Sequence, residues 1–405
     1  MNIFVSILGL GFLILVHEAG HFFVARAVGM NPRKFYIGFP PAVAKTRRNG
    51  IEYGIGAIPL GGYVKIPGMH RPAAGDLDVH LGRAVAEAPA LTSAVEELRR
   101  ALDEEDHSRA RAAVAAVRAE VEATHLSPGA AKAAERGLTD IEDALGPDAY
   151  WRARTWKRVA VIFAGPGANL LLAVVLFAAL FLATSGAFRL GFVLGADDEG
   201  AATRLVEEVV EDTPAASSGL RAGDRIVAID GRPVAVDQIR GTISGSEGRP
   251  LTLTVHRAGV QVELDPVRPE QTGDYGFGES LWQAVRVTGL VTKEIGATIG
   301  RLVTGEGREE IASPVGIVQG SSQAADRGAN DYFWVLGLIS LSLALLNLLP
   351  LLPLDGGHIA FSLIEGVRGK AVAREVYERV SVVGIAVVLL LFFIGLSNDI
   401  GRLGS

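Results

Sequence analysis

The sequence contains no cysteine among its 405 residues. This absence excludes a disulfide framework, a metal site built from thiolates and catalysis by a cysteine nucleophile. The chain also lacks an excess of positive charge, since its formal net charge is −6 at pH 7. Nothing in the composition therefore favours nucleic acid as a partner. Apolar residues, in contrast, make up 49% of the chain, and the mean hydropathy is +0.30. These values are typical of a membrane protein with substantial soluble parts.

Charged residues are missing from the first part of the chain, where every residue from Ile3 to Val16 is apolar, glycine or serine. No lysine or arginine precedes Arg26, which disfavours a cleaved signal peptide. We instead expect a membrane span, because about 20 apolar residues cross the hydrocarbon core of a bilayer. Four such spans are predicted: Met1–Val24, Val159–Thr184, Phe333–Leu354 and Ser381–Leu396. The last is short and would need neighbouring helices or a thin bilayer.

Ionisable residues interrupt the first predicted span directly after its apolar run, in the sequence His17-Glu18-Ala19-Gly20-His21. A charged side chain inside the bilayer costs roughly 3 kcal/mol, so it persists only with a partner or a function. On a helix, residues four apart share one face, and two imidazoles at this spacing can bind one zinc ion. The pattern predicts that His17 and His21 are metal ligands and that Glu18 polarises the catalytic water.

A second polar motif lies at the end of the predicted third span, where Pro350 and Pro353 precede Asp355. Prolines break a helix, and the released backbone groups need water or protein partners, which indicates a hydrated cavity. An aspartate from a second helix suits zinc, because a His₂Asp site leaves the fourth tetrahedral position open. We therefore predict Asp355 as the third ligand and expect His358 to lie on the cytoplasmic side without binding the metal.

Charge is distributed unevenly between the predicted loops. Six basic residues and no acidic ones occur from Arg26 to Arg48, whereas residues 185–332 are net acidic. By the positive-inside rule, the first loop is expected in the cytoplasm and the second outside. Both termini would then lie outside a cell (inner or plasma) membrane. The motifs of the first and third spans would share a depth toward the cytoplasmic side, which favours a single site.

Three further regions differ in composition. Residues 32–69 are rich in glycine, aromatic and β-branched residues and predict short strands, with a turn at Arg48-Asn49-Gly50. Residues 72–148 are rich in alanine, glutamate and arginine and predict a cytoplasmic insertion of two or three helices. We interpret this insertion as a solvated helical hairpin, with a partner-docking module as the alternative. Residues 204–269 are again β-rich, and residues 279–302 predict an amphipathic helix that could lie on the membrane surface.

The motifs occur in one order along the chain. Besides the HEAGH sequence and Asn347-x-x-Pro350-x-x-Pro353-Leu354-Asp355-Gly356-Gly357, they include PLGGYVK at 59–65, FAGP at 163–166, GLRAGD at 219–224 and SPVGI at 313–317. In these motifs the sequence resembles the site-2 protease family of intramembrane zinc metalloproteases, in its four-span bacterial form with one PDZ domain. The resemblance covers almost the whole chain except about residues 72–148.

The resemblance implies specific roles for eight residues and one Zn²⁺ per chain. The implied zinc ligands are His17, His21 and Asp355, the general base is Glu18, and the substrate-binding residues are Asn347, Gly61, Gly62 and Tyr63. The last three belong to the β-rich element, which would contact an extended substrate strand. The PDZ domain would act as a size filter or a tail reader.

The implied activity is cleavage of a transmembrane segment, such as that of an anti-sigma factor or a remnant signal peptide. The implied partners are a transmembrane substrate protein, cut first outside by another protease, and the lipid bilayer. A membrane scaffold with a PDZ domain and structural zinc is one alternative, and the intact catalytic residues argue against it. An ion-coupled transporter that uses His17, Glu18 and Asp355 as relay groups is another, and the lack of an evident internal repeat argues against that.

The expected fold is a polytopic α-helical membrane protein with four transmembrane helices, a membrane-associated β-rich element, an inserted cytoplasmic helical segment and an extracytoplasmic β-rich PDZ domain. The expected order of parts is the first transmembrane helix (1–30), the β-rich element (31–71), the helical insertion (72–150), the interfacial anchor and second transmembrane helix (151–185), the PDZ domain (186–270), the amphipathic helix and linker (271–332), the third transmembrane helix (333–360), and a cytoplasmic loop with the fourth transmembrane helix (361–405).

Overall fold

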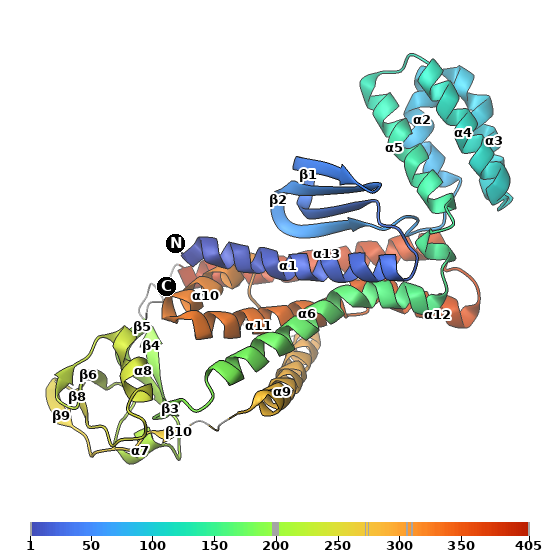
Figure 1. Ribbon diagram of the computed structural model, residues 1–405. Coiled ribbons are helices and arrows are strands. Elements are labelled where there is room, and N and C mark those ends of the chain that lie inside the picture. The colour runs from blue at the N-terminus through green and yellow to red at the C-terminus, as the bar shows by residue number, and fades with distance from the viewer. Residues whose placement is uncertain are drawn as a thin grey trace. The chain divides into compact units, whose positions relative to one another are not determined.

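The computed structural model describes residues 2–196, 202–271, 273, 275–304, 307–308 and 311–403. The chain divides into two compact units, and each is described by itself. Unit 1 contains residues 1–12, 169–345 and 386–405, and unit 2 contains residues 13–168 and 346–385. Four helices contribute residues to both units: α1 (Asn2–Ala27), α6 (Thr155–Ala183), α11 (Ala329–Asn347) and α13 (Arg374–Leu403) (Figure 1).

Four helices of the described chain are long and apolar enough to cross a membrane, which confirms the number of spans predicted from the sequence. These candidate spans are Ile3–Ala27, Thr155–Ala183, Ala329–Asn347 and Glu375–Gly401. Large apolar side chains such as Leu171 and Leu390 are exposed on them. Exposure of this kind is costly in water and favourable against lipid, so it fits helices that face a bilayer.

The structure corrects the predicted end of the third span. Its helix, α11 (Ala329–Asn347), ends before the two prolines, and Asp355 begins a separate helix, α12 (Asp355–Arg368). Pro350 and Pro353 lack backbone N–H groups, and proline disfavours helical conformation in the residue before it. The metal-ligand candidate therefore lies at a helix start and not at the end of a span.

The fourth span is also longer than predicted, because α13 has 30 residues. The polar residues before Ser381 and after Leu396 continue the helix, although they fall outside the apolar run. The candidate span covers Glu375–Gly401, which is long enough to cross a bilayer of ordinary thickness.

The β-rich element of unit 2 consists of two long strands, β1 (Lys34–Arg48) and β2 (Ile51–Lys65), rather than several short ones. The predicted turn joins them, with positive φ at Asn49 (50°) and Gly50 (79°) as a type I′ turn requires. The strands fold back on each other, so that Phe35 pairs with both Tyr53 and Val64. Within the described part of the chain, residues 62–65 of β2 pair only with residues 34–37 and form an edge of this sheet.

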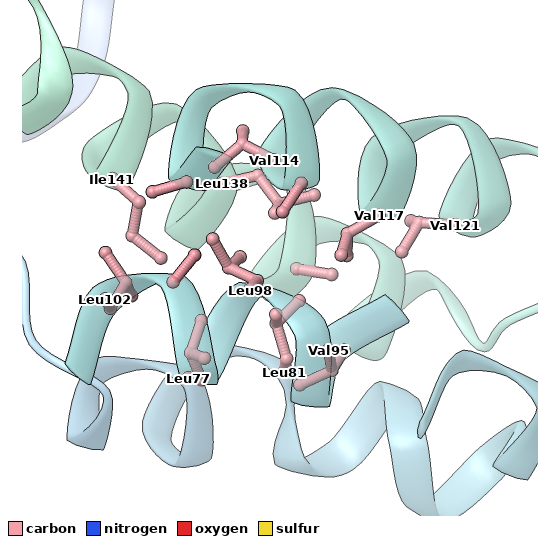
Figure 2. Close-up of a cluster of buried hydrophobic side chains, with 14 of the residues drawn as sticks. Leu77, Leu81, Val95, Leu98, Leu102, Val114, Val117, Val121, Leu138 and Ile141 are labelled. Atoms are coloured by element: carbon pink, nitrogen blue, oxygen red, sulfur yellow. The ribbon is translucent and has the colours of Figure 1, made fainter. Parts of the chain in front are cut away.

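The insertion of unit 2 is a bundle of four α-helices, one more than the largest number predicted. The helices are α2 (Gly75–Glu87), α3 (Thr92–Asp103), α4 (His107–Ala123) and α5 (Pro128–Leu145), with a short 3₁₀ helix η1 (Pro89–Leu91). Sequence reasoning missed α2. Leucine, valine and alanine side chains from all four helices fill the centre, as Figure 2 shows for Leu81, Leu98 and Leu138. The bundle therefore has a hydrophobic core of its own.

Unit 1 contains a β-rich domain with strand order β4-β5-β6-β8-β9, and β7 pairs with β6. The strands are β4 (Phe192–Ala196), β5 (Ala202–Val209), β6 (Arg225–Ile229), β7 (Arg232–Pro233), β8 (Leu253–Arg257) and β9 (Val260–Glu263). Helices α7 (Pro214–Ser217) and α8 (Val236–Ser244) lie between strands, and β3 (Phe188–Arg189) pairs with β10 (Glu270–Gln271). Buried Val206, Ile226 and Leu253 are part of its core.

Two more helices of unit 1 follow this domain. Helix α9 (Phe277–Thr304) covers the segment predicted to be amphipathic. Its Ala284 is buried with Phe177 and Leu341, whereas Leu281 and Trp282 are exposed. Its location at the membrane surface stays a prediction. Helix α10 (Pro314–Arg327) is capped by Ser313, whose Oγ accepts a hydrogen bond from the N–H of Val315.

Candidate metal centre

Helix α1 presents two imidazoles on one face. His17 and His21 are both buried, at 8% and 7% exposure, and their Nε2 atoms are 3.2 Å apart. The rings meet edge to face with centroids 4.8 Å apart. This arrangement follows directly from their spacing of four residues, which is close to one helical turn.

Asp355 approaches the imidazoles from the first residue of α12. Its Oδ2 lies 3.2 Å from His17 Nε2 and 3.4 Å from His21 Nε2. The rest of α12 is held on α6 by Arg158, which donates to Glu365 at 2.6 Å and to Ser362 at 3.0 Å. This part-buried ion pair fixes the helix that carries the carboxylate.

The three side chains fit a tetrahedral metal ion. His21 Nδ1 lies 2.8 Å from the carbonyl oxygen of Val161, so it donates a proton and leaves a lone pair on Nε2. This lone pair faces the buried Oδ2 of Asp355, for which no hydrogen-bond donor is present among the described residues. A tetrahedral zinc ion with bonds of about 2.0–2.1 Å holds its ligands about 3.3–3.4 Å apart, close to the observed 3.2–3.4 Å. A cation would therefore relieve the repulsion between the acceptors.

Two glycines allow α6 to approach the metal-ligand candidates closely. A Cβ at Gly165 would overlap His21 Nε2, and a Cβ at Gly20 would overlap the carbonyl of Ala164. Helices pack at such short distances only through residues without side chains. Sequence reasoning assigned no role in the site to Gly165 or to the carbonyl of Val161. The sequence feature that could have indicated close packing here is Gly165-Pro166-Gly167 within an apolar run, and α6 continues through it.

Glu18 lies beside the metal-ligand candidates and against the edge of the β-sheet. A Cβ at Gly62 would overlap Glu18 Cγ, so β2 can pass here only with glycine. The backbone N–H of Val64 is within hydrogen-bonding reach of the Glu18 carboxylate. Of the other substrate-binding candidates, Gly61 and Tyr63 flank Gly62 in β2, and Asn347 is the last residue of α11.

Comparison with known proteins assigns this geometry to a family. Peptidase family M50 matches residues 5–391, which include the imidazoles, the carboxylates and the edge strand. The chain belongs to peptidase family M50. This family includes the site-2 proteases, so the resemblance identified from the sequence motifs is confirmed.

Bacterial relatives match this chain over most of its length. A protein of Agrobacterium fabrum whose name places it among zinc metalloproteases is 30% identical over 98% of this chain and 95% of its own. The probable protease Eep of Enterococcus faecalis is 28% identical over 99% of both chains. The zinc metalloprotease Rip1 of Mycobacterium tuberculosis is 28% identical over 88% of this chain and 83% of its own.

The family and the geometry together define the protein as an intramembrane zinc metalloprotease. Zinc is its cofactor, and His17, His21 and Asp355 are the candidate ligands that the structure brings together. The prediction of an enzyme is thereby confirmed against the scaffold and transporter alternatives.

Proposed function

We propose that this M50 peptidase cleaves transmembrane segments of membrane proteins, such as anti-sigma factors or remnant signal peptides. The observation that carries the proposal is the location of the site: His17, Glu18 and His21 lie on a helix that is long and apolar enough to span a membrane. A soluble substrate gains nothing from a site at this position, whereas a membrane-embedded peptide reaches it directly.

Glu18 is the proposed general base. His17, His21 and Asp355 would hold the zinc ion, which would supply a Lewis acid for the scissile carbonyl and lower the pKa of the attacking water. The Glu18 carboxylate lies next to this triangle of donor atoms and accepts the proton of the attacking water. It then returns the proton to the leaving amine nitrogen, so that the peptide bond breaks without release of an amide anion.

The substrate is proposed to bind as an extended strand, because the carbonyls of a helix are shielded by their own hydrogen bonds. Residues 62–65 pair with β1 on one side, and their other side is proposed to receive the substrate strand by strand addition. Gly61, Gly62 and Tyr63 would contact the substrate strand there, and the Asn347 amide would donate a hydrogen bond to its backbone. Gly62 is especially suited, since a missing side chain admits a second backbone close to Glu18.

The β-rich domain of unit 1 is the proposed PDZ domain. Its sheet of short strands with two small helices and a single core supports this assignment. We propose that it excludes substrates with bulky external parts, so that another protease must cut them first outside. Deletion of residues 204–269 with a flexible replacement should leave zinc binding intact and admit untrimmed substrates.

The proposed orientation places both termini and the β-rich domain of unit 1 outside and the helical bundle in the cytoplasm. Six basic residues and no acidic ones, from Arg26 in the last turn of α1 to Arg48, support it. A topology reporter near Ser108 should respond as cytoplasmic, and one near Gly245 as external. Equal signals from both positions would contradict the orientation.

The deciding experiment uses Glu18→Gln. This change keeps the shape of the side chain but removes the base, so we expect at least a roughly 10²-fold loss of cleavage with about one zinc retained per chain. Quantitative proteomics of membranes from cells with this variant should reveal accumulated transmembrane fragments, trimmed on the outside. Rapid hydrolysis by purified, zinc-loaded Glu18→Gln protein would contradict the role of Glu18.

A further inference from the structure

The helical bundle leaves and rejoins the rest of unit 2 at a single point. The N–H of Tyr150 donates to the carbonyl of Pro67 at 2.9 Å, and the N–H of Trp151 donates to the carbonyl of Gly68 at 3.1 Å. The two ends of the insertion are thus hydrogen-bonded to each other. A domain joined in this way can be accommodated without disturbing the surrounding fold.

The bundle also contacts the β-sheet through a cluster of charged side chains. We call this cluster the clamp, and it consists of Arg33, Lys65, Asp140, Asp143 and Asp148. Lys65 Nζ lies 2.6 Å from Asp140 and 3.0 Å from Asp143. Arg33 lies 2.8 Å from Asp143 and 2.9 Å from Asp148. The side chains of Asp143 and Asp148 are only 11% and 13% exposed, whereas that of Asp140 is 42% exposed.

The two cations of the clamp belong to adjacent strand ends. The N–H of Arg33 donates to the carbonyl of Lys65 at 2.7 Å, which joins the start of β1 to the end of β2. Both side chains therefore lie at the same corner of the sheet, where β1 begins and β2 ends. Part-buried, hydrogen-bonded ion pairs of this kind fix geometry more strongly than exposed pairs, which contribute little.

The same short stretch of β2 touches Glu18. Gly62 lies against the Glu18 side chain, the Val64 N–H faces its carboxylate, and Lys65 is the next residue. Val64 also packs on the apolar cluster that includes Ala25 of α1. A strand rises about 3.3 Å per residue, so only about 10 Å separate Gly62 from Lys65. A shift at the clamp is thus transmitted to the base over a very short distance.

We propose that the helical bundle positions the catalytic edge strand through Asp140 and Asp143, which hold Lys65 and thereby set β2 against Glu18. The inference rests on the proposed function of Glu18 as the base. The insertion is then neither a solvated hairpin without a chemical role nor a module that docks a partner. The bundle supports the site. Asp140 and Asp143 act through β2 and are positioning residues.

The edge strand needs this support because it has one neighbour. Residues 62–65 pair with β1 on one side, and the opposite side is the one that would receive a substrate strand. Strand addition is most favourable when the edge strand is already fixed in position relative to Glu18 before the substrate binds. Without the clamp, part of the binding free energy would be consumed in ordering β2.

The test combines Asp140→Asn with Asp143→Asn in the full-length, zinc-loaded protein. The amides keep the size of the side chains and remove both negative partners of Lys65. Since displacement of a reacting group by ~1 Å can cost about 10²-fold, we expect kcat for a transmembrane peptide to fall about tenfold or more. Zinc content should stay at the level of the unmodified protein. Backbone hydrogen exchange of residues 62–65 should accelerate.

Glu142→Ala is the matched control, because Glu142 lies on the same helix and pairs with Arg118 inside the bundle. It should change neither kcat nor exchange in β2. A charge-exchanged variant, Lys65→Asp with Asp140→Lys, should recover at least half of the rate that Lys65→Asp alone loses. This recovery separates positioning from general damage to the fold.

The inference is overturned if the double amide variant behaves like Glu142→Ala in both kcat and exchange. It is equally overturned if the variant loses zinc, since the site would then have collapsed and not shifted. If the unmodified protein cleaves no membrane peptide, the proposed function fails, while the exchange measurement still decides whether the bundle holds β2.

Discussion

Two polar clusters of unit 2 show opposite principles of construction. In the metal centre, His17, His21 and Asp355 bring acceptor atoms to within 3.2–3.4 Å of one another. In the clamp, Arg33 and Lys65 face carboxylates at 2.6–3.0 Å, so every close contact joins opposite charges. Each carboxylate of the clamp has a lysine or arginine nitrogen within 3.0 Å, whereas the metal centre brings together only imidazoles and a carboxylate. Such a set of donor atoms suits a metal ion, and a cluster of paired opposite charges suits a structural contact.

The surroundings of the two clusters reinforce this difference. The imidazoles belong to an apolar helix in which water is scarce, and an unsatisfied polar group there costs several kcal/mol. The clamp lies at the end of a sheet, and its Lys65 side chain is 21% exposed. Loss of one ligand should thus abolish the first cluster, while loss of one pair should only loosen the second.

The largest effect is expected from Asp355→Ala. This change removes one of three ligands, so zinc content should fall well below one per chain and cleavage should be lost together with it. Metal analysis of the purified protein measures this directly, with Glu18→Gln as the variant that loses cleavage and keeps zinc. Full zinc content in Asp355→Ala would show that Asp355 only begins α12.

A smaller effect is expected from Gly165→Val, which leaves every ligand in place. The new side chain would overlap both imidazole Nε2 atoms and force α6 away from α1. We expect zinc affinity to fall by about 10- to 100-fold, the usual range when a group that orients metal ligands is disturbed. Gly11→Ala in α1 is the control, because no atom lies within 4 Å of its added Cβ. Equal affinities in both variants would refute close packing at Gly165.

The smallest effect concerns the clamp under a change of pH. Burial opposes the charge of Lys65, but hydrogen bonds to Asp140 and Asp143 outweigh it and raise the pKa of Lys65 above its usual value. A raised lysine pKa stabilises the fold at all pH values below about 10, and this contribution is lost only as pH rises further. Hydrogen exchange in residues 62–65, corrected for intrinsic rates, should therefore stay constant between about pH 6 and 8.5 in the zinc-loaded protein.

The metal centre should behave differently over the same interval, because imidazoles must be deprotonated to bind zinc. Zinc affinity should fall as pH drops toward about 6, while the clamp does not respond. If zinc affinity and backbone hydrogen exchange in residues 62–65 changed in parallel with pH, the two clusters would be coupled. The metal centre and the clamp would then not be independent.

Individual residues show how far sequence reasoning reached. His17 and His21 were predictable as ligand candidates because helical spacing alone brings them together. Asp355 was predictable as a candidate because two prolines precede its carboxylate and end the helix before it. Gly165 was not predictable, since a glycine in an apolar helix has the same appearance whether it faces lipid or a neighbouring helix. Helix α2 (Gly75–Glu87) was missed although it is about as long as α3, which was predicted, and although both helices begin without a side-chain cap.

Local sequence specifies four apolar spans, two imidazoles one turn apart with a glutamate between them, and a carboxylate that follows two helix-breaking prolines. These features depend on composition and on local backbone geometry, which are properties of short segments. Which of the segments meet depends on packing in three dimensions. Gly165 approaches the imidazoles, Gly62 approaches Glu18, and Lys65 approaches Asp143, and these residues are 44 to 148 positions apart in the sequence. Such contacts arise from packing between elements, and no local pattern encodes them.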